Sequence, residues 1–88
     1  MEHGSETFTD LVTKCLPAGS SVEAYAVRLG MSAKTLYRLR SGATIRVNMA
    51  TLKKLGKMRL HGRVVGHARV SRALARSREF YASLLSRA

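Results

Sequence analysis

The sequence predicts an all-α fold, a compact bundle of about five helices that ends in a long amphipathic helix. Three observations favour it. The first two of five proposed helical segments carry apolar residues at the spacing i, i+3, i+4, i+7, which lines one face of an α-helix, and the other three also gather their apolar residues on one side. Ser or Asn precedes several of these segments and Gly or Pro follows them, in the positions that begin and end helices. Strand-like alternation is weak, and 88 residues suffice for one small domain.

The first two helices are predicted over residues 6–16 and 22–29. The first has four apolar residues on one face, namely Phe8, Leu11, Val12 and Cys15. Pro17 then ends it. The second repeats the spacing in Val22, Tyr25, Ala26 and Leu29. Either Ser20 or Ser21 caps its start, and Gly30 follows its end, where the left-handed conformation favours glycine.

The third helix is predicted over residues 33–41, between a capping Ser32 and Gly42. Leu36 and Leu39 point to one side of this helix. The opposite side is a narrow polar stripe made of Lys34, Tyr37, Arg38 and Ser41. Such a helix packs its apolar side on a core and presents the polar side outward.

The fourth helix is predicted over residues 49–60, capped by Asn48 after a loop over residues 42–48. Its buried side chains are expected to be Leu52, Leu55 and Met58. Two glycines then interrupt the pattern, and Val64 and Val65 favour a short strand between them.

The last helix is predicted over residues 67–87 and has the broadest apolar arc. The arc consists of Val70, Ala73, Leu74, Ser77, Tyr81, Leu84 and Leu85. Four arginines lie beside it, in position to contact phosphates at the flanks of a DNA site: Arg69, Arg72, Arg76 and Arg87. The arc must pack on the domain, on a second copy of the chain, or on an anionic membrane. The membrane is disfavoured because the arc contains Ala and Ser and no Trp.

Charge is distributed very unevenly. The chain has sixteen Lys and Arg against five Asp and Glu, a net charge of +11. Residues 1–33 carry two basic and four acidic groups, a net charge of −2, whereas residues 34–88 carry fourteen basic groups and only Glu79, a net charge of +13. This polarity favours a polyanionic partner over a merely soluble basic surface.

Several function classes lack their signatures. Cys15 is the only cysteine, so no internal disulfide forms, and a reducing cytoplasm is expected. No apolar run approaches the roughly 20 residues that span a bilayer, and the acidic N-terminus differs from a secretory signal. The three histidines do not share a metal-ligand spacing, and there is no Gly-rich phosphate loop or catalytic pair. We therefore expect no enzyme activity, cofactor or metal.

Residues 22–41 have the pattern of a helix-turn-helix, a unit that reads DNA. The first helix needs a small residue where the second crosses it, and Ala26 fits. The turn needs a residue that adopts positive φ, and Gly30 fits. The second helix needs aliphatic anchors inside and polar groups outside, which the third predicted helix supplies.

The stretch SVEAYAVRLGMSAKTLYRLRSG, residues 21–42, resembles the Cro-like, lambda-repressor-like helix-turn-helix family. Its small, turn and anchor positions are matched by Ala26, Gly30, Leu36 and Leu39, and its apolar-then-capping pair by Met31 and Ser32. Residues 48–58 are similar to the family's following helix, so the resemblance covers about residues 6–60. The family commonly has Gln at the first position of helix two, where this chain has Val22. Backbone amides at that helix start can still bind a phosphate.

The resemblance implies base-reading roles for the outer side of the third helix. Arg38 would bind a guanine through O6 and N7, and Lys34 a guanine or a phosphate. Ala33 offers an apolar contact to a thymine methyl. Tyr37 would reach a base or a phosphate, with a ring packed at the domain edge as the alternative, and Ser41 completes the stripe. The expected DNA-backbone contacts are Ser21, Ser32, Thr35, Arg40, Arg46 and Asn48, among which Arg40 has a solvated charge as its alternative interpretation.

The resemblance also implies a phage- or plasmid-type regulator, acting as a homodimeric repressor on a palindromic operator. In this interpretation residues 1–60 are the DNA-binding domain and residues 61–88 the dimerisation element, since dimers read two half-sites about one DNA turn apart. A second hypothesis is an antitoxin-type interaction module whose residues 67–88 bind a partner protein, with DNA binding for autoregulation. RNA binding is a weaker third option, because aromatic residues for base stacking are few.

Overall fold

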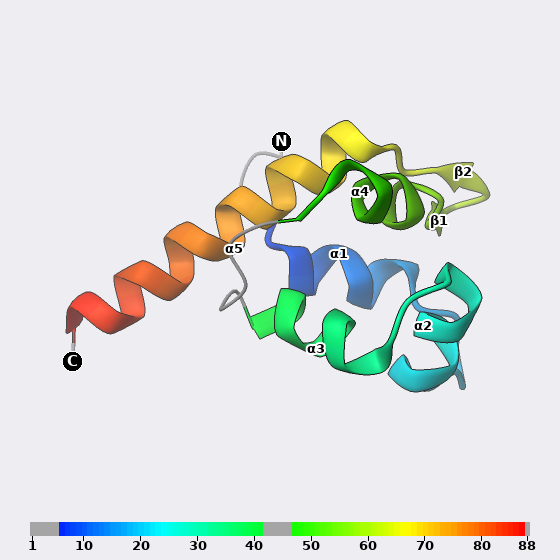
Figure 1. Cartoon of the computed structure of the whole chain (residues 1–88), viewed down its shortest axis with the longest axis horizontal. Coiled ribbons are helices and arrows are strands. Elements are labelled where there is room, and N and C mark those ends of the chain that lie inside the picture. Colours follow the sequence, from blue (N-terminus) through cyan, green and yellow to red (C-terminus); the bar gives the residue numbers. More distant parts are fainter. Residues whose placement is uncertain (1–5, 42–46, 88) are drawn as a thin grey trace.

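Five helices and one short β-hairpin follow one another along the part of the chain that the structure describes (Figure 1). The computed structural model describes residues 6–41 and 47–87, with the backbone alone for residues 81, 84, 85 and 87. The elements are α1 (Phe8–Cys15), α2 (Val22–Leu29), α3 (Ala33–Ser41), α4 (Met49–Gly56), β1 (Arg59–Leu60), β2 (Arg63–Val64) and α5 (His67–Arg87). The predicted all-α bundle is confirmed, and the loop expected over residues 42–48 lies largely outside the described residues.

Helix starts are set by side-chain caps. Thr7 begins α1 with a capping box, in which its hydroxyl accepts from the Asp10 amide and the Asp10 carboxylate accepts from the Thr7 amide. Helix α1 therefore starts at Phe8, two residues after the predicted start. Asn48 caps α4 as expected from the sequence, and of the two serines that the sequence left open for α2 the cap is Ser21.

Helix α4 ends at Gly56, so the predicted extension to residue 60 is wrong. The backbone of Gly56 lies directly against the start of α5, and its carbonyl accepts a 2.9 Å hydrogen bond from the Gly66 amide. A Cβ at Gly56 would lie 2.8 Å from the His67 nitrogen. The chain has to leave the helix here because this close backbone approach brings α5 onto α4.

The chain between α4 and α5 forms an antiparallel hairpin, with Arg59 paired to Val64 and Leu60 to Arg63. The sequence predicted only one strand, over Val64 and Val65, one residue later than β2. His61 and Gly62 both have positive φ, 55° and 77°, as a two-residue type I′ hairpin turn requires. The turn fixes the register in which the two strands pair. The apolar residues Val64 and Val65, on which the predicted strand was based, carry no information about this register.

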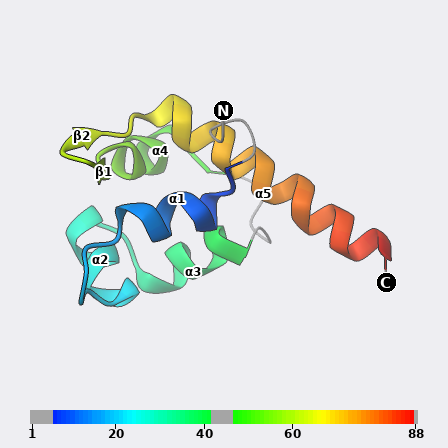
Figure 2. The same ribbon diagram turned by 180° about the vertical axis from the view of Figure 1, so that it is seen from behind.

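Helix α1 lies between two layers, with α2 and α3 on one side and α4 and α5 on the other (Figures 1 and 2). The core joins all five helices, and its largest fully buried side chains are Phe8, Leu11, Val12, Leu36, Leu39, Leu55, Met58 and Val70. Cys15 is buried among them, and burial raises the pKa of its thiol. The predicted apolar faces of the helices are thereby confirmed where the structure describes their side chains, whereas Tyr81, Leu84 and Leu85 of the predicted arc on α5 lie outside the described side chains.

Helix α5 has two parts with different surroundings. Its first turns complete the core through Val70 and Ala73, whereas its last turns extend away from the other elements (Figure 1). None of the described helices has the length and apolar character needed to span a bilayer.

A buried carboxylate joins the N-terminal segment to α1 and α5. Glu6 is 4% exposed and accepts hydrogen bonds from the Arg69 guanidinium at 2.8 and 3.0 Å and from Lys14 Nζ at 3.0 Å. The hydrogen bond from Arg69 is the main reason that the pKa of Glu6 falls to about 2, against the cost of burial. The sequence predicted that Arg69 contacts DNA phosphates. This prediction is wrong, because the Arg69 guanidinium pairs with the buried Glu6 carboxylate.

Replacement of Gly56 with alanine should destabilise the protein by about 1–3 kcal/mol, because the new methyl group overlaps the backbone at the start of α5. At an unobstructed helix position the same change would stabilise the protein by roughly 0.5–1 kcal/mol. Urea denaturation measures the change in the free energy of unfolding. A decrease in Gly56→Ala would support the close approach, and an increase would contradict it.

The Glu6 carboxylate should make stability depend on pH in the acid range. Because its pKa is about 2 when folded, against an ordinary value of 4.5, its contribution is complete above pH 4.5 and is lost as the pH falls towards 2. The contribution is about 3 kcal/mol at neutral pH. Urea denaturation between pH 7 and 2.5 should show this loss in the wild type and in the exposed control Glu79→Gln, but much less of it in Glu6→Gln. Equal pH profiles for all three proteins would contradict the assignment.

Candidate nucleic-acid interface

Helices α2 and α3 are joined by a tight turn over residues 30–32. Gly30 adopts the left-handed conformation, with φ 80° and ψ 32°. Its amide donates to the Val27 carbonyl at 3.0 Å, and the Met31 amide donates to the Ala26 carbonyl at 3.0 Å. These two bonds satisfy carbonyls at the end of α2 and turn the chain sharply. The positive φ predicted at Gly30 is confirmed.

The inner side of α3 is anchored in the core. Leu36 and Leu39 are 0% and 2% exposed, and Ala26 on α2 is 0% exposed where the two helices pack. The Ser32 hydroxyl caps α3 by accepting from the Thr35 amide at 3.1 Å. Thr9 on α1 donates its hydroxyl proton to the Arg40 carbonyl at 2.7 Å and so holds the other end of α3. The start of α3 is thus joined to α2 through the hydrogen bond from Met31 to Ala26, its end is joined to α1 through Thr9, and its inner side is buried in the core.

The outer side of α3 brings together the polar stripe that the sequence predicted. Lys34, Tyr37, Arg38 and Ser41 are all exposed. Neither Lys34 nor Arg38 forms an ion pair with another residue of the described ranges. The Ser41 hydroxyl donates to the Arg38 carbonyl at 2.8 Å, which orients it along the helix. Two uncompensated cations on a rigid, exposed helix face are available to an anionic partner.

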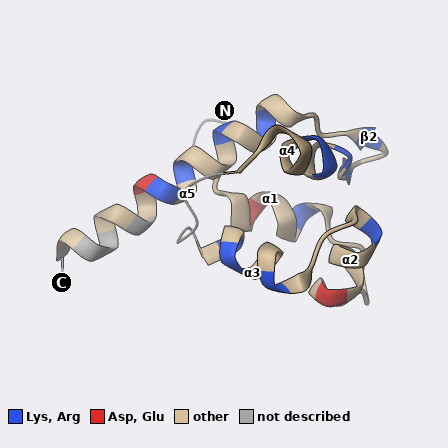
Figure 3. Ribbon diagram, viewed as in Figure 1, with Lys and Arg blue, Asp and Glu red and all other residues tan. Residues whose placement is uncertain are grey.

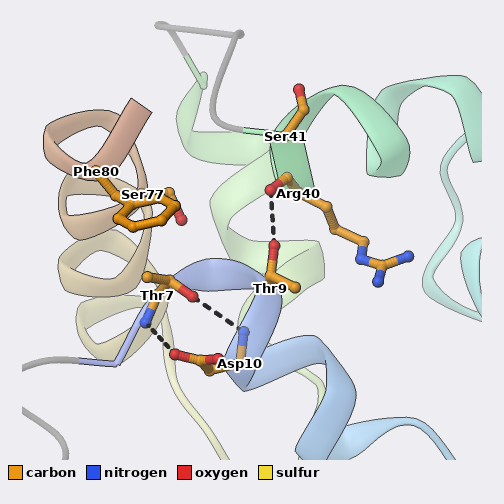
Figure 4. A pocket seen from close by; sticks show the side chains of 7 residues that line it. All are labelled: Thr7, Thr9, Asp10, Arg40, Ser41, Ser77 and Phe80. Carbon is orange, nitrogen blue, oxygen red and sulfur yellow. Dashed lines mark hydrogen bonds between the residues drawn. The ribbon is translucent and has the colours of Figure 1, made fainter. Parts of the chain in front are cut away.

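Ala33 and Arg40 lie at the margin of this face, and both are half-buried. Arg40 lines a recess of about 430 Å³ where α1, α3 and α5 meet, together with Thr7, Thr9, Asp10, Ser41, Ser77 and Phe80. Figure 4 shows the Arg40 guanidinium pointing away from Phe80 and out of the recess. Its Nε is buried with no hydrogen-bond partner among the described residues. Arg40 is therefore half-buried, and it is not the fully solvated charge of the alternative interpretation.

The serine and asparagine residues predicted to contact the DNA backbone are helix caps. The oxygens of Ser21 and Asn48 accept from the amides of Ala24 at 3.1 Å and Thr51 at 2.8 Å. The Ser32 hydroxyl also lies 2.8 Å from that of Thr35, which is exposed. Caps mark helix N-termini, where backbone amides face outward and attract anions. Arg46, the remaining predicted contact, lies outside the described residues.

A hydrogen bond that the sequence did not reveal joins the two helices on their outer side. The Tyr37 hydroxyl donates to the Glu23 carboxylate at 2.8 Å. Tyr37 is 45% exposed, and both groups face solvent. This bond lowers the pKa of Glu23 and raises the pKa of Tyr37. The only signal in the sequence is that Glu23, in the first turn of α2, is the sole acidic residue between positions 21 and 41.

Positive charge continues beyond α3 onto α4, the hairpin and α5 (Figure 3). Lys54 on α4 reaches the turn of the helix-turn-helix, where its Nζ donates to the Gly30 carbonyl at 3.0 Å. Helix α4 therefore contributes a cation beside the end of α2. Within the described ranges, no three His, Cys, Asp or Glu side chains converge as metal ligands would.

No protein-family model matches the chain, and no curated protein or solved structure matches it significantly. Its function is therefore inferred from the geometry of its own residues.

The bond between Glu23 and Tyr37 should be visible in the free protein by titration. Because the carboxylate accepts the phenol proton, Glu23→Gln should lower the pKa of Tyr37 towards its ordinary value. NMR of the Tyr37 ring during an alkaline titration measures this, with Glu79→Gln as a control that removes the same charge from α5. A Tyr37 pKa that is equal in all three proteins would show that the bond is absent.

Proposed function

We propose that the chain binds double-stranded DNA as a sequence-specific transcription regulator, with α3 in the major groove. The observation that carries the proposal is the exposed stripe of α3, which contains Lys34, Arg38 and two hydroxyl groups on a helix joined to α2 at its start and to α1 at its end. A helix fits the width of the major groove, and a rigid one can hold its side chains at fixed base positions. The resemblance of residues 21–42 to Cro-like regulators supports the same proposal.

Arg38 is the proposed principal base-reading residue. Its guanidinium is exposed near the middle of the stripe and can donate two hydrogen bonds to O6 and N7 of guanine. Lys34 lies one turn earlier on the same side and serves as a second contact, to a guanine or to a phosphate. Capped N-termini of α2 and α3 supply amides that position the DNA backbone.

The proposed active form is a homodimer that acts as a repressor on a palindromic site. The last turns of α5 extend beyond the bundle (Figure 1), and Phe80, on the part of α5 that lines the recess shared with α1 and α3, is 60% exposed. Pairing of two such helices would cover this apolar surface and place two α3 helices on half-sites about one DNA turn apart. The proposed location is the cytoplasm, whose reducing environment suits the free thiol of Cys15.

The same extension of α5 favours a second candidate, an antitoxin-type protein whose α5 binds a partner protein. The two candidates differ in the isolated protein. A dimer would protect the amides of the last turns of α5 from hydrogen exchange in a concentration-dependent manner, whereas an interaction helix that awaits a partner would exchange quickly at all concentrations.

Selection of bound duplexes from a random DNA pool tests the proposal directly. A palindromic motif with guanine at one position in each half-site is the expected result. Arg38→Ala should then weaken binding to the selected duplex by about 1–3 kcal/mol and relax that position. Arg63→Ala is the control, since it removes an exposed charge from β2, on the other side of α1 from α3 (Figure 1). Equal effects of the two substitutions would show that α3 does not read the base.

Affinity should also depend steeply on salt. If a dimer contacts roughly six to ten phosphates, affinity should fall about 10³- to 10⁵-fold between 50 and 200 mM salt. Fluorescence anisotropy with a labelled duplex measures the slope. A slope near zero would contradict the electrostatic part of the proposal.

A further inference from the structure

The hydrogen bond between Tyr37 and Glu23 fixes the direction in which the tyrosine hydroxyl can act. An ionised carboxylate has no proton to give and only accepts hydrogen bonds. The Tyr37 hydroxyl has one proton, and it donates this proton to Glu23 at 2.8 Å. The Tyr37 oxygen still has free lone pairs, so towards any other partner it can only accept a hydrogen bond.

The pair of Tyr37 and Glu23 lies on the face that is proposed to bind DNA, so the donor and acceptor roles of the Tyr37 hydroxyl matter for DNA recognition. Tyr37 lies on the outer side of α3 between Lys34 and Arg38 in the sequence, and 45% of it is exposed. Glu23 reaches it from the first turn of α2, beside the same face. A duplex bound on the α3 stripe would meet the Tyr37 oxygen with its proton already directed at Glu23.

Resting on the proposed DNA-binding function, we propose that Glu23 is a specificity-determining residue, which holds the Tyr37 hydroxyl as a hydrogen-bond acceptor towards the major groove. In that groove only adenine N6 and cytosine N4 present amino protons. Guanine O6 and N7 and thymine O4 are acceptors, and they would face the Tyr37 lone pairs without a proton between them. The base opposite Tyr37 is therefore adenine or cytosine, an amine-bearing base.

The same arrangement disfavours a phosphate as the partner of Tyr37. Phosphate oxygens are acceptors too, and the Glu23 charge beside them is repulsive. Glu23 thus lowers the affinity for every duplex while it raises the selectivity at one position. This combination distinguishes a specificity device from a general DNA-backbone contact.

Three proteins test the inference on the duplex selected by the wild type and on a random duplex. Tyr37→Phe removes the hydroxyl and should reduce discrimination at one base position by about three- to tenfold, because the lost hydrogen bond is made to one base only. Glu23→Gln should relax the same position, because a glutamine amide can either accept from or donate to the hydroxyl. It should also raise the affinity for both duplexes by roughly twofold or more at low salt, since one negative charge is lost. Glu79→Gln removes the same charge from α5 and should leave the base preference intact.

A base analogue identifies the contact. Replacing the amine-bearing base at that position with an analogue that lacks the exocyclic amine should weaken binding of the wild type about three- to tenfold and have no effect on Tyr37→Phe. Equal losses in both proteins, or a uniform loss of affinity for all duplexes in Tyr37→Phe, would overturn the inference while leaving DNA binding in place. A wild type that selects no duplex would instead overturn the proposed function, and the inference with it.

Discussion

A buried carboxylate needs cationic partners beside it, and in this chain that requirement joins the N-terminal segment to α1 and to the start of α5. Glu6 is almost inaccessible to solvent and is paired with Arg69 on α5 and Lys14 on α1. A buried charge without partners is strongly unfavourable, so Glu6 is compatible only with a fold that keeps the start of α5 beside α1. That placement brings Val70 and Ala73 into the core and lets α5 close the side of α1 opposite α3.

The packing around α1 determines how α3 is presented. Leu36 and Leu39 bury the inner side of α3, and the Thr9 hydroxyl holds the Arg40 carbonyl at its end. Because α1 packs against α5 as well as α3 in one continuous core, movement of α3 would disturb the whole core. The outer stripe is therefore displayed on a rigid support, which a side chain that reads a base edge needs.

Charge on the proposed DNA face is balanced rather than simply maximised. Lys34 and Arg38 attract a polyanion, and the positive charge of α4 and the hairpin adds a wider field. Glu23 opposes this attraction locally and orients Tyr37. Attraction alone would bind any nucleic acid, whereas a fixed acceptor beside a fixed donor distinguishes between bases.

The sequence by itself determined the elements whose signals lie within a turn or two of the chain. Capping of α2 by one of two serines and of α4 by Asn48, the positive φ of Gly30, the anchors of α3 and the bounds of α5 were all predictable, because helix caps and apolar periodicity are local. Only the tertiary structure decided where α4 ends, how the hairpin pairs, and that Arg69 neutralises Glu6. It also decided the contacts of Thr9 with Arg40 and of Tyr37 with Glu23. Those partners lie 63, 31 and 14 residues apart, and no local pattern records a contact that exists only once the helices have packed.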